Sequence, residues 1–229
     1  MQQKDLIKAL LILENPQYLE AIDISRTKTN KTVMACEEEL SKEFNKLFNL
    51  IIKNSMTRLS AEQQFGKEIR GKINACIQKA YFAGQSYVAK ATKKPVVLTV
   101  DDVIFMEDLT DKIYNAFFDK VDKINWRYEF LSNPLLIAQV NSLPQTVMIN
   151  VVQIATTNAI QALYSDGSIN SNKVIFKNDP SSNVCNFCYP LDDRIFEADD
   201  PNKPEIPVHP NCHCRYLVYS ETDRSPIVG

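Results

Sequence analysis

The chain has 229 residues, of which 26 are basic and 28 acidic, so its net charge is close to zero. This near-equal balance of charges excludes a protein that binds nucleic acid through its overall charge. Only five glycines are present, where average usage of about 7% predicts roughly sixteen, and this scarcity favours helices. No apolar run approaches the roughly eighteen residues that a bilayer-spanning helix needs, so we expect a soluble protein with no membrane partner.

Apolar residues at helical spacing predict three long helices before residue 125. Their predicted limits are Val33 to Ser55, Ser60 (the N-cap) to Lys94, and Asp101 or Asp102 (the N-cap) to Ile124. Pro95 breaks the second helix, and residues 96–100 are predicted to form an extended link. Cys36 and Cys76 lie on the apolar stripes of the first two helices, which predicts that both are small buried hydrophobes and not metal ligands.

The second half of the chain changes character. Asn133-Pro134 predicts a turn between a helical N-terminal part, residues 1–132, and a C-terminal subdomain, residues 133–229. Pro144 lies near the start of a further predicted helix, which ends at Asp166-Gly167. Strands are predicted at residues 173–177, at 194–196 and in the CRYLVYS sequence from 214 to 220. The expected fold class is therefore mainly α, a helical body with a small C-terminal α+β subdomain.

Charge is unevenly distributed along the helical part. Residues 58–94 hold eight basic and two acidic side chains, whereas residues 101–122 hold seven acidic and two basic ones. Two helices that pair through complementary solvated faces would explain this pattern. The alternative is that the basic helix contacts packaged DNA or an acidic partner. The residues available for that contact are Arg58, Lys67, Arg70, Lys72, Lys79, Lys90, Lys93 and Lys94.

The cysteines near the C-terminus have the spacing of a metal site. Cys185 and Cys188 are separated by two residues, and after twenty more residues come His209, Cys212 and Cys214. Sulfur and imidazole ligands in two clusters are typical of tetrahedral Zn²⁺. Five candidates for four positions leave the choice among them open. The alternatives are disulfides or a redox pair, but a redox Cys-x-x-Cys normally follows a strand in a βαβ unit, and none is recognisable. The N-terminal sequence MQQKDLIKALLIL does not resemble a signal peptide either.

A structural role for one zinc ion is favoured over a catalytic one. A hydrolytic zinc site keeps one coordination position open and has a carboxylate base nearby. The chain contains no His-Glu-x-x-His motif and no zinc deaminase signature. Residues 178–211 are rich in Pro, Asp and Asn and have little core of their own. Zinc binding, worth about 10–16 kcal/mol in small zinc domains, is sufficient to fold such a segment. The subdomain is therefore expected to be zinc-stapled.

Residues from about 150 to 219 resemble the C-terminal region of the phage head morphogenesis family, the minor head proteins similar to phage Mu protein F. The resemblance rests on the order and spacing of four stretches. They are IATTNAIQALYSDG, KVIFKNDPSSNVCNFC, LDDRIF and IPVHPNCHCRYLV. It implies that the five candidate ligands occupy the metal positions of the family and that residues 191–196 form its hairpin. Asp193 stands where the family usually has glycine, and His213 where it usually has arginine. The N-terminal helices indicate no family.

The resemblance implies a structural minor capsid protein of a tailed virus or provirus, acting in head assembly. Its expected partners are the portal protein and the major capsid protein, with packaged DNA as a further one. Its expected location is the virion, in the head interior or portal region, after the host cytoplasm during assembly. Many copies per assembly are expected, and no enzymatic activity.

Two other functions compete with this one. A zinc-stapled ββα-metal nuclease would need His213 as its catalytic histidine, with Asp192, Asp193 or Asp199 as carboxylates. A cellular zinc-ribbon module that binds nucleic acid would need basic and aromatic residues around the cysteines. Instead, residues 179–205 hold seven acidic and two basic side chains, a field that repels phosphate.

Overall fold

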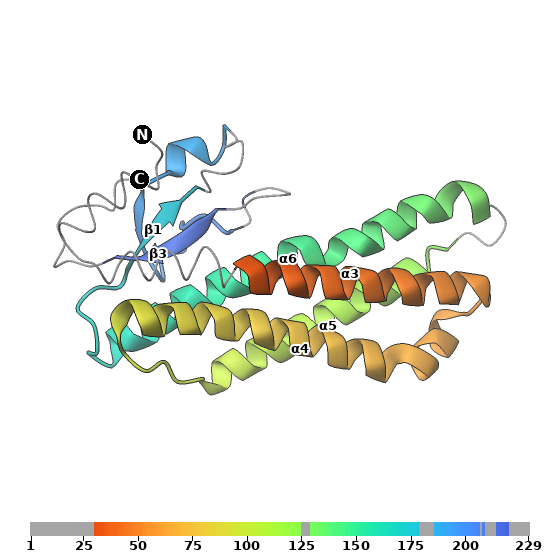
Figure 1. Ribbon diagram of the computed structural model, residues 1–229, viewed down its shortest axis with the longest axis horizontal. Helices are drawn as coiled ribbons and strands as arrows, with labels where there is room; N and C mark the ends of the chain where they lie inside the picture. Colours follow the sequence, from red (N-terminus) through yellow and green to blue (C-terminus); the bar gives the residue numbers. More distant parts are fainter. Residues whose placement is uncertain (1–29, 125–128, 179–185, 207, 209–213, 220–229) are drawn as a thin grey trace. The chain divides into compact units, whose positions relative to one another are not determined.

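The computed structural model describes residues 30–124, 129–178, 186–206, 208 and 214–219 (Figure 1). Most of these residues are helical and a single small sheet accompanies them, so the predicted mainly α class is confirmed. The chain divides into two compact units. Among the described residues, the helical unit comprises those within 33–80 and 98–148, and the sheet unit comprises those within 30–32, 81–97 and 149–219. No helix within the described ranges has the length and apolar character needed to cross a membrane.

The helical unit is built from α3 (Asn30–Lys53), α5 (Val100–Val121) and the adjoining parts of α4 (Arg58–Thr92) and α6 (Glu129–Ser165). The apolar stripes predicted for the first three helices are largely buried, because hydrophobic side chains at a spacing of three and four share one helix face. At the centre of this core, the rings of Phe44 and Phe117 lie 4.9 Å apart, and those of Phe117 and Phe118 lie 5.1 Å apart. Cys36 and Cys76 are each 1% exposed, which confirms that both are core residues.

Two helix starts differ from the prediction. Thr57, and not Ser60, caps α4, because its hydroxyl accepts a 3.3 Å hydrogen bond from the Ser60 amide. Helix α5 begins at Val100 with Thr99 as its N-cap. The Thr99 hydroxyl accepts a bond from the Asp102 amide, and the Asp102 carboxylate accepts one from the Thr99 amide. Asp102 therefore belongs to a capping box as its third helical residue, a position that favours acidic side chains.

The turn predicted at Asn133-Pro134 is wrong. Helix α6 runs without interruption from Glu129 to Ser165, so it continues through Pro134, and Pro144 lies in its interior and not near its start. A proline inside a helix removes one backbone hydrogen bond and costs about 3 kcal/mol. Burial of apolar side chains such as Val140, Met148 and Val152 along the same helix offsets that cost. The boundary predicted after residue 132 falls within this helix.

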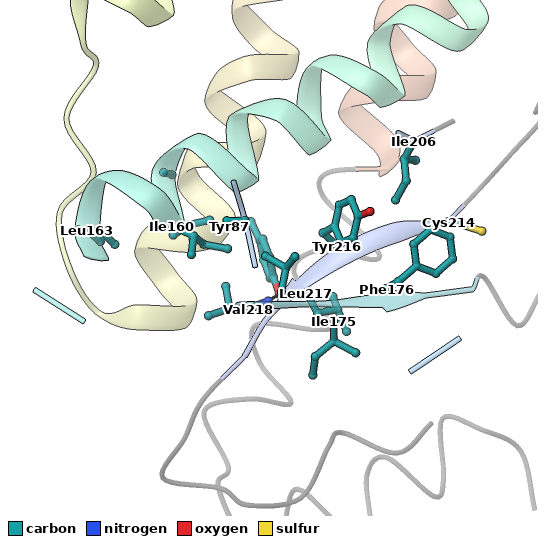
Figure 2. Packing of buried hydrophobic residues seen from close by; sticks show 14 of the residues in the cluster. Tyr87, Ile160, Leu163, Ile175, Phe176, Ile206, Cys214, Tyr216, Leu217 and Val218 are labelled. Atoms are coloured by element: carbon teal, nitrogen blue, oxygen red, sulfur yellow. Dashed lines mark hydrogen bonds between the residues drawn. The ribbon is translucent and has the colours of Figure 1, made fainter. Parts of the chain in front are cut away.

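The sheet unit contains three antiparallel strands in the order β2-β1-β3. They are β1 (Lys173–Lys177), β2 (Ile195–Glu197) and β3 (Arg215–Val218), close to the three predicted strands. Their apolar side chains pack with the part of α4 after residue 80 and the part of α6 after residue 148 in a single core. Figure 2 shows Tyr87, Ile160 and Leu163 from the helices beside Phe176, Tyr216 and Val218 from the strands.

Candidate metal centre

The pairing of β1 with β3 sets side by side the two strand ends that adjoin the cysteine clusters in the sequence. Lys177, the last residue of β1, is paired with Arg215, the first residue of β3. The chain leaves this end of β1 toward Cys185 and enters this end of β3 directly from Cys214. Cys188 and Cys214, the described members of two clusters that are twenty residues apart in the sequence, thus belong to segments next to these paired strand ends.

Cys188 and Cys214 are the two candidate ligands that the structure describes, and both are buried, at 1% and 6% exposure. Both belong to the core of the sheet unit, and Figure 2 shows Cys214 near Phe176. The Cys214 thiol donates a 3.3 Å hydrogen bond to the Asn178 side-chain carbonyl. The Cys188 carbonyl accepts a bond from the Leu191 amide, which begins the short 3₁₀ helix η2 (Tyr189–Leu191). Each sulfur is thus held by local backbone or side-chain structure.

Cys185, His209 and Cys212 lie outside the described residues. Within the described part of the chain, no group of three or more His, Cys, Asp and Glu side chains could hold a metal ion. The five-residue site therefore stays a prediction. Its two described members fit zinc in chemistry and placement, because both are soft sulfur donors, shielded from water, on segments that the sheet brings to one end.

Two buried cations lie at this end of the sheet and were not predicted from the sequence. Lys177 is 3% exposed and Arg215 is 6% exposed. Lys177 Nζ lies 2.6 Å from Asp193 Oδ1 and 3.3 Å from Asp192 Oδ1. Two carboxylates thus neutralise the buried ammonium of Lys177. The sequence signal for this arrangement is weak, because the strand KVIFK carries a lysine at each end and only Lys177 is buried.

Residues 191–194 form a turn, in which the Arg194 amide donates a 3.1 Å hydrogen bond to the Leu191 carbonyl, and this turn leads into β2. β2 pairs with β1, placing Ile195 opposite Ile175 and Phe196 opposite Val174. Asp193 has a φ of 64°, a left-handed conformation that favours glycine, and its amide donates to the Phe176 carbonyl. The phage head morphogenesis family, which this segment resembles, usually has glycine at this position. Here the Asp193 carboxylate binds the buried Lys177 ammonium, which offsets the cost of a side chain in this conformation.

Tyr216 holds the acidic, proline-rich loop that leads to His209. Its hydroxyl donates a 2.5 Å hydrogen bond to the Pro204 carbonyl, and the Lys203 ammonium lies 5.1 Å from its ring centroid. Burial raises the pKa of the Tyr216 hydroxyl and lowers that of the Lys203 ammonium. Ile206, two residues beyond Pro204, is buried in the same core. Tyr216 thus binds to the sheet the chain segment that precedes the second cysteine cluster in the sequence.

Four of the eight basic residues between positions 58 and 94 form ion pairs. Within the helical unit, Arg58 binds Asp119 and Asp122, and Arg70 binds Asp111, all on the acidic helix α5. Lys72 binds Glu43, and Lys79 binds Glu39, both on α3. The pairing of the basic helix with the acidic helix that the charge pattern predicts is confirmed for Arg58 and Arg70, whereas Lys72 and Lys79 pair with α3 instead. The other four members of the basic set are exposed and make no ion pair with a described residue; they are Lys67, Lys90, Lys93 and Lys94.

The three carboxylates considered for a nuclease all have structural partners. Asp192 accepts a 2.9 Å hydrogen bond from the Asn178 amide, and Asp193 binds Lys177. Asp199 accepts a 2.7 Å bond from the Asn172 side chain. These contacts join the hairpin and the following loop to β1 and its flanking residues. His213, the histidine that such an enzyme would use, lies outside the described residues.

Searches with this chain against protein-family models, curated proteins and solved structures find no match.

Proposed function

We propose that this chain is a structural minor head protein of a tailed virus or provirus, associated with the portal or the capsid during head assembly. The observation that carries the proposal is the order of elements from residue 150 onward. A helix is followed by a strand, a Cys-x-x-Cys pair, a Leu-Asp hairpin, a proline-rich loop and a His-Pro-Asn-Cys cluster that runs into a strand. This order is that of the phage head morphogenesis family.

The contacts of the sheet unit support a binding role over a catalytic one. The carboxylates near the cysteines are engaged with Lys177, Asn178 and Asn172, so they act as connections between loops and strands. In this proposal one zinc ion is held by four of the set Cys185, Cys188, His209, Cys212 and Cys214. When bound, the zinc supplies a cross-link between the two clusters and no reaction chemistry. The ordered end of the sheet then serves as a rigid surface for a partner protein.

Contact with packaged DNA is a secondary part of the proposal. Three exposed lysines with no described ion partner lie at the C-terminal end of α4: Lys90 is in its last turn, and Lys93 and Lys94 follow its final residue, Thr92. Lysines of this kind bind phosphate, and the affinity falls steeply with salt because counterions are released. Replacing all three by glutamine should weaken binding to duplex DNA and flatten its salt dependence. Unchanged binding would assign any DNA contact to other residues.

The experiment that tests the function compares virus particles made with and without this chain. Purified particles should contain the protein, detected by mass spectrometry, in many copies together with portal and capsid proteins. Deletion of the gene should reduce the yield of complete heads. A Cys188→Ser, Cys214→Ser double variant should behave like the deletion, whereas Lys42→Gln, an exposed change on α3, should not. The function is wrong if particles lack the protein and form normally without it.

A further inference from the structure

Two cysteines outside the tail face each other across the helical unit. Helices α3 and α4 are joined by residues 54–57 and run antiparallel. Cys76 lies on α4 between Lys72 and Lys79, which bind Glu43 and Glu39 of α3 at 2.9 and 3.3 Å. Cys36 lies one turn before Glu39 on α3. These ion pairs therefore hold the two helices together on either side of Cys76.

The side chains of the two cysteines are hydrogen-bonded to each other. The Cys76 thiol donates a hydrogen bond to the Cys36 sulfur, and Cys76 Sγ lies 4.0 Å from Glu39 Oε2. The bond from Cys76 lowers the pKa of the Cys36 thiol, burial raises it, and the Lys79 ammonium lowers it further. Cys36 is thus the better nucleophile of the pair, since the thiolate is the reactive form. Nothing in the head-protein function uses either thiol.

We propose that Cys36 and Cys76 are an oxidation site, at which a peroxide converts the pair into a disulfide that joins α3 to α4. The Cys36 thiol releases its proton, the thiolate attacks one peroxide oxygen, and the O–O bond breaks. The sulfur becomes a sulfenic acid, and the second oxygen leaves as hydroxide and takes up the Cys36 proton to give water. The Cys76 sulfur then attacks the Cys36 sulfur. The S–O bond breaks, and the hydroxide that leaves takes up the Cys76 proton. Two thiols and one hydrogen peroxide thus give one disulfide and two waters.

Both thiols are 1% exposed, so the oxidant reaches them only when the α3–α4 hairpin opens locally. The reaction is therefore slower than that of an exposed thiol. Its product closes a covalent loop over residues 37–75 and restricts the unfolded chain. Such a loop stabilises the folded state by up to about 4 kcal/mol and should raise the melting temperature of a chain of this size by about 10 °C.

The test uses the full chain purified with zinc and treated with hydrogen peroxide. The sample is then alkylated, digested with trypsin without reduction, and analysed by mass spectrometry. Cys36 lies in the tryptic peptide 32–42 and Cys76 in the peptide 73–79. The expected product is these two peptides joined, lighter by about 2 Da than their sum because two hydrogens are lost. As the yield of the linked peptides increases, the melting temperature of the sample should increase with it.

Cys36→Ser and Cys76→Ser should each abolish the linked peptide, and the rise in melting temperature with it. If either variant fails to fold, the wild-type digest decides alone. The proposal is overturned if both thiols remain alkylated, if Cys36 carries only sulfinic or sulfonic acid, or if either cysteine is joined to a tail cysteine. Because the digest reports residues 36 and 76 separately from the tail, this result is independent of zinc binding and of head assembly.

Discussion

The Gln153 side-chain carbonyl on α6 accepts a 2.7 Å hydrogen bond from the Tyr216 amide on β3. One step along the same edge, the Tyr87 hydroxyl on α4 accepts a 3.2 Å bond from the Val218 amide, a pair visible in Figure 2. These amides point away from β1, because Tyr219 next to them is the residue that bonds to Lys173 of β1. Helix side chains thus satisfy the outward amides of an edge strand, groups that otherwise invite pairing with another chain.

Replacing Gln153 by leucine should destabilise the protein by about 1–3 kcal/mol, because the buried Tyr216 amide loses its acceptor and cannot reach water. Urea unfolding followed by circular dichroism measures the change. Gln78→Leu is the matched control, because Gln78 is exposed on α4 and should change stability little. Equal losses in the two variants would show that the Gln153 bond contributes nothing specific.

Three substitutions at Asp193 separate its backbone role from its charge. Asp193→Asn keeps a side chain tolerant of the left-handed conformation and removes the charge that Lys177 binds. Asp193→Gly removes the strain of a side chain in the left-handed conformation, but it leaves Asp192 as the carboxylate bound to Lys177. Asp193→Ala keeps that backbone strain and also removes the carboxylate that binds Lys177. The alanine variant should therefore be the least stable, with a free energy of unfolding about 2–3 kcal/mol below that of wild type. The asparagine and glycine variants should lie between wild type and the alanine variant. Thermal unfolding gives the order, and alanine as stable as glycine would contradict the backbone role.

The stability of the helical unit should fall as the pH rises through the range from 4.5 to about 7. Burial, together with the charge on Cys36, raises the pKa of Glu37 from 4.5 to about 7. One Glu37 carboxylate oxygen is buried and has no hydrogen-bond partner among the described residues. The folded state therefore binds the proton more tightly than the unfolded state. Its contribution is complete below pH 4.5 and is lost as Glu37 ionises in the folded state.

Glu37→Gln should remove this loss and make the protein more stable than wild type at pH 8. The gain should be about 1–2 kcal/mol once solvent screening of a half-buried carboxylate is allowed for. Urea unfolding at pH 5 and pH 8 measures it. The control is Glu38→Gln, whose exposed carboxylate is hydrogen-bonded to Lys42, which lowers its pKa. This variant should not gain stability at pH 8, and a gain equal to that of Glu37→Gln would rule out the proposed cause.

Zinc content should separate the tail cysteines from the core cysteines. The purified chain is expected to hold about one zinc ion, and Cys188→Ser or Cys214→Ser should reduce its affinity strongly, because each removes a sulfur ligand. Cys36→Ser and Cys76→Ser change equally buried thiols in the helical unit and should leave the zinc content unchanged. Elemental analysis after dialysis against a weak chelator measures all four. Full zinc content in the tail variants would refute the site.

Chelation of that zinc should loosen the tail without melting the helices. Residues 186–206 are joined to the sheet by contacts such as Asp193 with Lys177 and Tyr216 with Pro204, whereas the core of the helical unit contains no candidate ligand. Proteolysis after chelation should therefore cut first beyond residue 178, and the helical circular dichroism signal should persist. Loss of that signal together with the zinc would mean that both units depend on the metal.

Local sequence determined the helices of the first half of the chain, the burial of Cys36 and Cys76, the three strands of the tail and the spacing of its cysteines. Each of these follows from neighbours a few residues apart, because helix faces repeat at about 3.6 residues and strand faces at two. Local sequence also predicted that basic and acidic helices would pair, as Arg58 and Arg70 do with α5.

Only the tertiary structure decided which of several local possibilities was used. Helix α6 continues through Pro134 and Pro144 because burial along its length outweighs the cost of proline, a comparison that no local pattern contains. Gln153, Tyr87, Lys177 and Tyr216 acquire their roles from strands and loops distant in sequence. The physical reason is that hydrogen bonds and buried charges depend on which segments meet, whereas periodicity depends only on which residues are adjacent.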